Sequence, residues 1–176
     1  MTNWRALILL THRWIGLTTS LVLIIAGATG SMMVWGFQGE FRRTVGRIHE
    51  NLALGNIGIW IVVAATAGAI LLQLGGIVLW WRRKTLRVRT GAGWRAGVND
   101  LHHAAGVLGL LLMLLIAATG VGMQMVSPGP TRKAFVDFHT SRRFPLAIDI
   151  IYAVGSLGFV VQGVTGILMW TKKVRS

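Results

Sequence analysis

The 176-residue chain contains no cysteine and few charged side chains. The absence of cysteine excludes disulfide bonds, cysteine-ligated zinc, iron–sulfur clusters and covalent CxxCH haem attachment. Charged residues make up 13% of the chain, whereas a typical soluble domain carries about 25%. Apolar residues reach 53% and the mean hydropathy is +0.62, which is more apolar surface than a soluble fold of this length can bury. The composition therefore indicates one membrane domain, residues 1–176.

Acidic side chains are scarce as well, with five Asp and Glu against 18 Lys and Arg, for a net charge of +13. The basic residues do not form one continuous face, so we expect no nucleic-acid partner. Instead they separate four long runs that are almost free of charge: residues 14–39, 51–81, 101–131 and 144–171. Each run exceeds the roughly 20 residues that cross a bilayer, and the sequence therefore predicts four transmembrane helices.

The basic residues are divided unequally between the two sides of this topology. Eleven lie on the side of the N-terminus, the 82–100 segment and the C-terminus, and seven lie on the other side. The positive-inside rule then predicts that both termini are cytoplasmic. On that side we expect an interfacial belt of Trp4, Trp80, Trp81, Trp94 and Trp170, and contact between the basic segment 82–95 and anionic membrane lipid.

The chain contains an internal repeat. A shift of 90 residues without a gap aligns 1–86 (repeat 1) with 91–176 (repeat 2), and 18 of the 86 pairs are identical, about three times the chance expectation. The identities include Trp-Arg-Ala at 4–6 and 94–96 and Ala-Thr-Gly at 28–30 and 118–120. Each repeat holds two predicted spans. The expected fold is an all-α membrane protein, a four-transmembrane-helix bundle made of two parallel-repeated helix hairpins.

Four of the five histidines form two repeat pairs. His12 and His102 lie near the cytoplasmic start of a span, whereas His49 and His139 lie on the outer side. A two-fold axis along the membrane normal would make the members of each pair face each other. Because haem iron takes two opposed axial ligands in an apolar slot, the sequence predicts two stacked bis-histidine haem b sites, one near each membrane face.

Neighbouring residues bear on the cytoplasmic pair. Gly16 and Gly106 follow the two histidines by one helical turn and would leave the helix faces bare for a flat macrocycle, although such glycines also serve helix packing. Arg13 and His103 occupy equivalent positions and would meet a haem propionate, while Arg13 is equally explained as a positive-inside residue. Zinc is less favoured, because two histidines without a carboxylate leave it under-coordinated.

The outer pair raises a problem of distance. Straight helices would place the two histidine levels about 34 Å apart, which is long for electron transfer between haems. Gly55 and Pro145 lie six residues after His49 and His139, and both residue types bend helices. A bend there would bring the outer histidines back towards the core. Without it, the outer pair would not be a haem site.

These segments resemble the PepSY-associated transmembrane helix family. The resemblance rests on His-Arg-Trp-Ile-Gly at 12–16, on the Thr-Gly near the end of spans one and three, on the histidine before spans two and four, and on the Gly-Ile exits that reach Trp80 and Trp170. The family includes bacterial inner-membrane reductases that release iron from siderophores. It implies two b-type haems held by histidines of the bundle, here His12, His49, His102 and His139. The chain lacks the PepSY segments usually inserted after odd-numbered helices, which favours a minimal electron conduit over siderophore binding.

The expected function is therefore a di-haem b-type cytochrome of a bacterial inner membrane. It would carry electrons from a quinol or a cytoplasmic reductant to a periplasmic ferric complex or redox protein, and ferric reductase activity is left open. The main alternative is a non-catalytic membrane subunit with structural histidines. A metal or solute transporter is disfavoured, because the predicted spans contain almost no ionisable residues.

Overall fold

The computed structural model describes residues 3–35, 37–81, 86, 89, 93–141 and 144–171. Helices contain 88% of these residues and strands contain none of them, which confirms the all-α prediction. By length and composition, three helices can cross a membrane: α1 (Trp4–Val34), α3 (Gly55–Trp80) and α7 (Leu146–Thr171). The pair α4 (Gly93–Leu108) and α5 (Leu110–Met125) adds a fourth candidate if the two helices form one broken span.

The break between α4 and α5 differs from the continuous third span that the sequence predicts. The two helices meet at Gly109 with a bend of 67°. A Cβ atom at Gly109 would lie 2.9 Å from the carbonyl oxygen of Ala105 and 3.0 Å from the sulfur of Met113. The bend therefore depends on the missing side chain. Thr19, the equivalent residue of repeat 1, lies within the unbroken α1.

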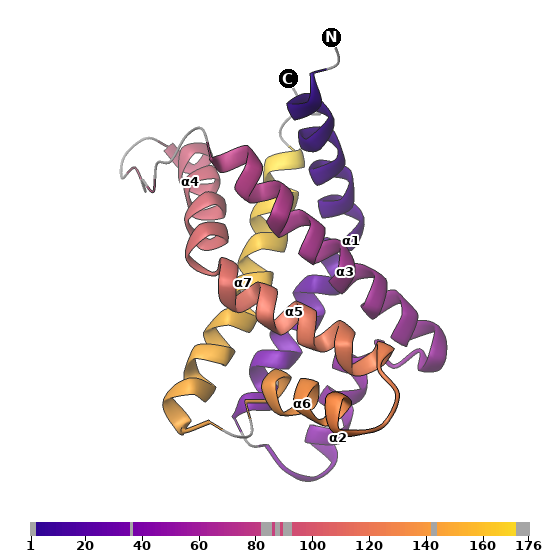
Figure 1. Cartoon of the computed structure of the whole chain (residues 1–176). Coiled ribbons are helices and arrows are strands. Elements are labelled where there is room, and N and C mark those ends of the chain that lie inside the picture. Colours follow the sequence, from indigo (N-terminus) through magenta and orange to yellow (C-terminus); the bar gives the residue numbers. More distant parts are fainter. Residues whose placement is uncertain are drawn as a thin grey trace.

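Two short helices, α2 (Gly39–Asn51) and α6 (Pro130–His139), connect the long ones on the side opposite the N-terminus (Figure 1). After α2 the chain reverses through left-handed backbone at Leu52, Ala53 and Gly55, with φ angles of 53°, 59° and 63°. Pro145 immediately precedes α7, where its fixed φ and missing N–H suit a helix start. The bends predicted at Gly55 and Pro145 are therefore confirmed.

The helix boundaries recur after 90 residues. Helix α3 corresponds to α7 and α2 to α6, while α1 corresponds to α4 and α5 together. Figure 1 shows the start of α1, the end of α3, the start of α4 and the end of α7 at one end of the molecule, with α2 and α6 at the other. Below, "inner" denotes the end that carries the start of α1, and "outer" denotes the end of α2 and α6.

The core lies where the long helices cross. Helix α1 packs against α7 and α3, α3 also packs against α5, and α4 packs against α7. The buried apolar cluster includes Leu23 of α1 and Phe159 of α7, together with Ala65, Ala69, Met113, Ile116, Ala117 and Tyr152. This cluster lies between the levels of the two histidine pairs and separates them with apolar side chains.

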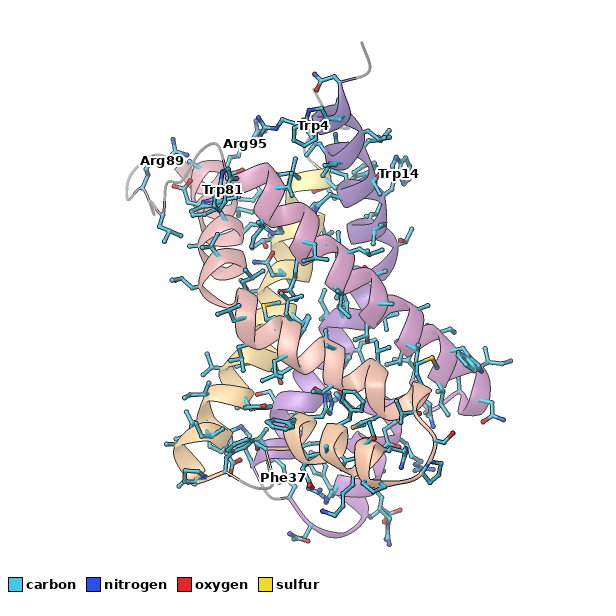
Figure 2. All side chains as sticks on the ribbon, in the orientation of Figure 1. Trp4, Trp14, Phe37, Trp81, Arg89 and Arg95 are labelled. Carbon is cyan, nitrogen blue, oxygen red and sulfur yellow. The ribbon has the colours of Figure 1, made fainter. Side chains whose placement is uncertain are left out.

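Aromatic and basic side chains gather at the inner end. Figure 2 shows Trp4, Trp14 and Trp81 there with Arg89 and Arg95. Trp4, Trp81 and Trp94 of the predicted belt are each more than half exposed, as an interfacial position requires. Many of the basic residues used to predict the membrane orientation and the lipid contact lie outside the described residues, namely Arg82, Arg83, Lys84, Arg87, Arg142, Arg143, Lys172, Lys173 and Arg175.

Candidate functional site

The outer histidines face each other across the bundle. His49 lies near the end of α2 and His139 at the end of α6, and their ring centroids are 6.0 Å apart with the ring planes at 39°. The two short helices carry these rings inward, towards the middle of α1 and α5. The straight-helix separation of about 34 Å is therefore wrong. His49 contacts Ala26, which follows His12 by 14 residues, or about 21 Å of helix.

Each outer imidazole rests on a Thr-Gly step of a long helix. Nδ1 of His49 is 2.9 Å from the carbonyl oxygen of Ala26 and 3.2 Å from the hydroxyl of Thr29. In repeat 2, Nδ1 of His139 is 3.0 Å from the Ile116 carbonyl and 3.3 Å from the Thr119 hydroxyl. A carbonyl accepts but cannot donate, so Nδ1 carries the hydrogen. Nε2 then keeps its lone pair and is available to a metal ion.

The glycine of each step lets the imidazole approach. A Cβ atom at Gly30 would lie 3.0 Å from Cε1 of His49, and one at Gly120 would lie 3.1 Å from Cε1 of His139. Both distances are shorter than the 3.5–4.0 Å optimum between carbon atoms. The two glycines therefore seat the outer histidines.

The inner histidines also face each other, but their surroundings differ. The ring centroids of His12 in α1 and His102 in α4 are 6.5 Å apart, with the ring planes at 84°. Nδ1 of His102 is 2.8 Å from the hydroxyl oxygen of Thr165. This hydroxyl donates to the Val161 carbonyl at 2.6 Å, so it accepts the hydrogen of Nδ1. The ring of His102 thus has the same available nitrogen as the outer rings.

His12 is the exception among the four. Its ring rests on Gly75 and Gly76, where a Cβ at Gly75 would be 3.6 Å from Nδ1 and one at Gly76 would be 3.6 Å from Cε1. Gly75 is the repeat equivalent of Thr165, so the hydroxyl is missing. Nδ1 of His12 is buried without a threonine hydroxyl, and the backbone carbonyl of Leu72 is the acceptor near this ring.

The same docking arrangement thus occurs at each of the four histidines. Three rings rest on Thr-Gly at 29–30, 119–120 and 165–166, and the fourth rests on Gly-Gly at 75–76. Ala-Thr-Gly at 28–30 and 118–120 marks the repeat in the sequence, but its part in docking the histidines was not predicted. The signal was present, because the 90-residue shift relates the step at 29–30 to that at 119–120 and the step at 75–76 to that at 165–166.

Two cavities contain the paired rings. The inner cavity, of about 880 Å³, is lined by His12, His102 and the four predicted neighbours Gly16, Gly106, Arg13 and His103. The outer cavity, of about 1040 Å³, is lined by His49 and His139. These volumes are of the order of cofactor pockets, which span about 300–1,000 Å³. Leu23 and Phe159 line both cavities and so form the partition between them.

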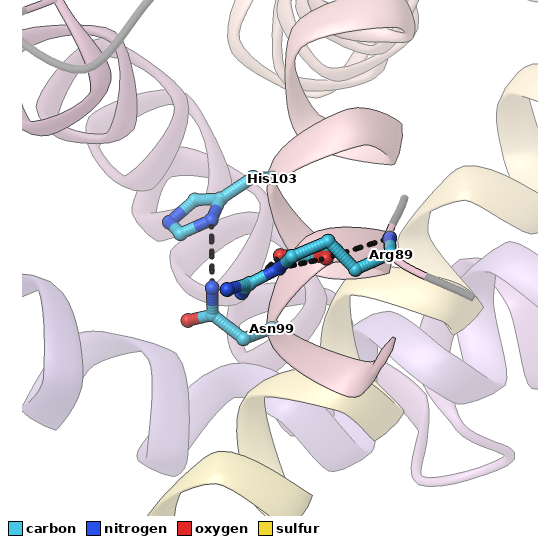
Figure 3. Close-up of polar contacts among 4 residues, drawn as sticks. Arg89, Asn99 and His103 are labelled. Atoms are coloured by element: carbon cyan, nitrogen blue, oxygen red, sulfur yellow. Dashed lines mark hydrogen bonds and ion pairs between the residues drawn. The ribbon is translucent and has the colours of Figure 1, made fainter. Parts of the chain in front are cut away.

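Polar side chains surround the inner cavity. The guanidinium of Arg13 lies over the ring of Trp170, 5.0 Å from its centroid. His103 contacts the Asn99 amide at 3.2 Å between nitrogens. Next to it, the carboxylate of Asp100 accepts hydrogen bonds of 3.0 Å from the backbone and the guanidinium of Arg89 (Figure 3). This contact fastens Arg89, from the segment that follows α3, onto α4 beside the cavity.

Two arginines at the outer cavity were not predicted. Arg42 donates to the Met33 carbonyl at 3.4 Å, and its repeat equivalent Arg132 donates to the Met123 carbonyl at 2.8 Å. Both guanidinium groups thus tie a short helix to the end of a long one and line the cavity. The arginine and methionine pairs are among the repeat identities, which was the available signal. Asp149 lines the same cavity and accepts a hydrogen bond from Ser141.

The outer imidazoles are neutral at physiological pH. Burial lowers the pKa of His139 to about 4 and also lowers the pKa of His49. A neutral imidazole is the form that binds metals. Within the described ranges, no group of three or more His, Asp or Glu side chains is arranged to hold a metal ion. Each pair therefore offers two nitrogens only, which is too few for a closed zinc site.

The spacing of the rings fits a metal ion held between two imidazoles. A metal–nitrogen bond of about 2.0 Å on each side, and about 1.2 Å from each ring nitrogen to its centroid, add up to about 6.4 Å. The observed centroid separations of 6.5 Å and 6.0 Å lie on either side of this value. Two opposed nitrogens with apolar walls are the donor set that a bis-histidine haem requires.

Comparison with known families decides the classification. A family model described as the PepSY-associated TM region matches residues 36–131, which are 96 of the 176 residues. The chain belongs to this family. The PepSY-associated TM segment contains His49 and His102, while the internal repeat relates His139 and His12 to them. No curated protein and no solved structure matches the chain.

Proposed function

We propose that this protein is a di-haem b-type cytochrome that carries electrons across a bacterial inner membrane. The main supporting observation is the paired docking of the histidines. Four imidazoles meet in two pairs at metal-binding separation, and three of them have Nδ1 held so that Nε2 is available. Structural histidines would have no reason to share this arrangement, since a single imidazole–carbonyl contact needs no facing partner.

In this proposal the fold is a bundle of four spans built from two parallel helix hairpins, with α4 and α5 forming the third span. Both termini are cytoplasmic, so the inner cavity faces the cytoplasm and the outer cavity faces the periplasm. The recurrence of the helix boundaries after 90 residues supports the hairpins. The exposed Trp4, Trp81 and Trp94 support a membrane interface at the inner end.

Haem would supply one-electron chemistry, and the chain would supply position and environment. His12 and His102 would hold one haem iron, and His49 and His139 would hold the other. Arg13 and His103, which line the inner cavity, would pair with propionates of the inner group, and Arg42 and Arg132, which line the outer cavity, with those of the outer group. Leu23 and Phe159 exclude water from the space between the two sites.

The direction of transfer follows from the proposed topology. A quinol or a cytoplasmic reductant would donate at the inner end, which also contacts membrane lipid. A ferric complex or a periplasmic redox protein would accept at the outer end, in the first case making the protein a ferric reductase. About 21 Å of α1 separates His12 from the docking site of His49. The partition of buried apolar side chains bridges this interval.

The test is a haem count on the purified protein. Protein expressed with ample haem supply should contain two haems per chain, with low-spin b-type bands in its reduced-minus-oxidised spectrum. His12→Ala and His49→Ala should each reduce the count to about one, because each removes one axial ligand. Leu157→Ala, at an exposed position of α7 that lines neither cavity, is the control and should keep two. Colourless protein, or a haem count that stays the same in His12→Ala and His49→Ala, would favour the non-catalytic membrane subunit.

A further inference from the structure

The two ligands of the inner site are unequal, although the repeat makes them equivalent. The hydroxyl of Thr165 accepts the Nδ1 hydrogen of His102 at 2.8 Å. At His12 the corresponding residue is Gly75, so the buried Nδ1 has no hydroxyl partner, and the backbone carbonyl of Leu72 is the acceptor near the ring. The difference comes from one residue, because the next glycine contacts both rings similarly. A Cβ at Gly76 would lie 3.6 Å from Cε1 of His12, and one at Gly166 would lie 3.8 Å from Cε1 of His102.

A second polar group on the same wall also lacks a partner. In the described part of the chain, four buried side-chain polar atoms make no hydrogen bond, and three of them belong to His12 and Gln73. Gln73 lies one helical turn before Gly76 on α3 and lines the inner cavity. Its repeat equivalent is Gly163. The α3 wall beside His12 therefore has unused hydrogen-bonding capacity that the α7 wall beside His102 lacks.

Hydrogen bonding at Nδ1 controls how firmly a histidine holds a metal. A partner at Nδ1 fixes the ring orientation and raises the basicity of Nε2. Removing such a partner typically lowers metal affinity by about 10- to 100-fold. His102, His49 and His139 have a threonine hydroxyl at Nδ1, and His12 has none. His12 is therefore the weakest of the four ligands by this criterion.

We propose that His12 is an exchangeable ligand, so that the inner site also binds a small neutral diatomic molecule on the α3 side. This inference rests on the proposed haem function. In the exchange, the bond between ferrous iron and Nε2 of His12 breaks and a bond from iron to the incoming molecule forms. The iron stays ferrous and the imidazole leaves as the neutral ring, so no electron or proton is transferred. The amide of Gln73 is available to donate to the bound molecule.

Carbon monoxide is the probe, added to the dithionite-reduced full-length protein in detergent. We expect CO to shift the Soret band of one haem out of two. In Gly75→Thr the new hydroxyl should reach Nδ1 of His12, because a Cβ at Gly75 already lies 3.6 Å from this atom in ordinary contact. CO affinity should then fall about 10- to 100-fold. Gly75→Val is the matched control, with the same shape and no hydroxyl, and its affinity should stay near that of the wild type.

The outcomes separate this inference from the proposed function. Two haems per chain with no CO binding, or with CO binding to both haems, would overturn the proposal that His12 is exchangeable. The proposed cytochrome function would not be affected. Equal CO affinity in Gly75→Thr and Gly75→Val would likewise show that the missing hydroxyl is not the cause. Protein without haem would overturn both proposals, and the haem count that precedes CO addition detects this case. If Gly75→Thr fails to fold, Thr165→Val provides a second test, because loss of support at His102 should raise CO affinity.

Discussion

The glycines beneath the four imidazoles allow a quantitative test of the histidine sites. Replacing Gly30 or Gly120 by alanine places a methyl group 3.0 or 3.1 Å from Cε1 of the outer histidine that rests there. Carbon atoms prefer about 3.5–4.0 Å, so the ring must move by roughly 0.5 Å. Replacing Gly76 or Gly166 places the methyl group 3.6 or 3.8 Å from an inner imidazole, which is ordinary contact. The same substitution should therefore damage the outer site and spare the inner one.

The expected size of the effect follows from the tolerance of metal sites. A displacement of about 0.5 Å is at the limit within which a ligand set stays productive. It also strains the Nδ1 hydrogen bond, whose loss typically costs about 10- to 100-fold in metal affinity. The outer haem should then be lost during purification, so that Gly30→Ala and Gly120→Ala retain about one haem per chain. Gly76→Ala and Gly166→Ala should retain two.

The assay is the pyridine haemochrome absorbance per mole of chain, after size-exclusion chromatography in detergent. A matching elution profile for all four variants shows that the bundle still folds. Equal haem counts in the four variants would refute the argument, because the outer and inner contact distances would then have no consequence. Loss of haem from Gly76→Ala alone would reverse the assignment of which site is tightly seated.

Two further predictions concern the partition and the inner end. Phe159→Ala should lower the free energy of unfolding by about 3 kcal/mol. The reason is that it removes a side chain that is only 7% exposed, and this removal would join the two cavities. Leu157→Ala, at a 46% exposed position, should change thermal stability little. Asp100→Asn should accelerate trypsin cleavage after Arg89 several-fold, because the buried carboxylate holds that guanidinium and backbone N–H. Asp137→Asn, which removes an ion pair between buried Asp137 and exposed Lys133 within α6, should leave that rate unchanged. Equal rates in both variants would contradict the reasoning.

Hydropathy and the repeat were sufficient to predict the all-helical fold and the pairing of the histidines. The long apolar runs predict spans because a bilayer requires apolar length, and that property is additive along the chain. The shift of 90 residues pairs His12 with His102 and His49 with His139, because symmetry-related positions approach the same axis. The ring separations of 6.5 and 6.0 Å agree with this pairing. The bends at Gly55 and Pro145 could also be predicted, since the backbone preferences of glycine and proline are local.

The depth of the outer histidines depended on tertiary structure. A straight-helix estimate placed them about 34 Å from the inner pair, whereas α2 and α6 fold back and bring them to the level of Ala26 and Ile116. The break at Gly109 was likewise hidden, because glycine is tolerated in membrane helices and bends them only where a neighbour fills the vacated space. Which outcome occurs depends on the packing of Met113 and on the angle between helices.

The docking of the histidine rings could likewise be predicted only in part from the sequence. The sequence by itself determined which histidines pair and where small residues lie. Only the tertiary structure decided which carbonyl and which hydroxyl each Nδ1 reaches, and that Gly75 stands where the other three rings have threonine. The physical reason is that a hydrogen bond between two helices depends on their axial offset and rotation. Side-chain packing along the whole interface sets both, and spacing along one chain does not encode them.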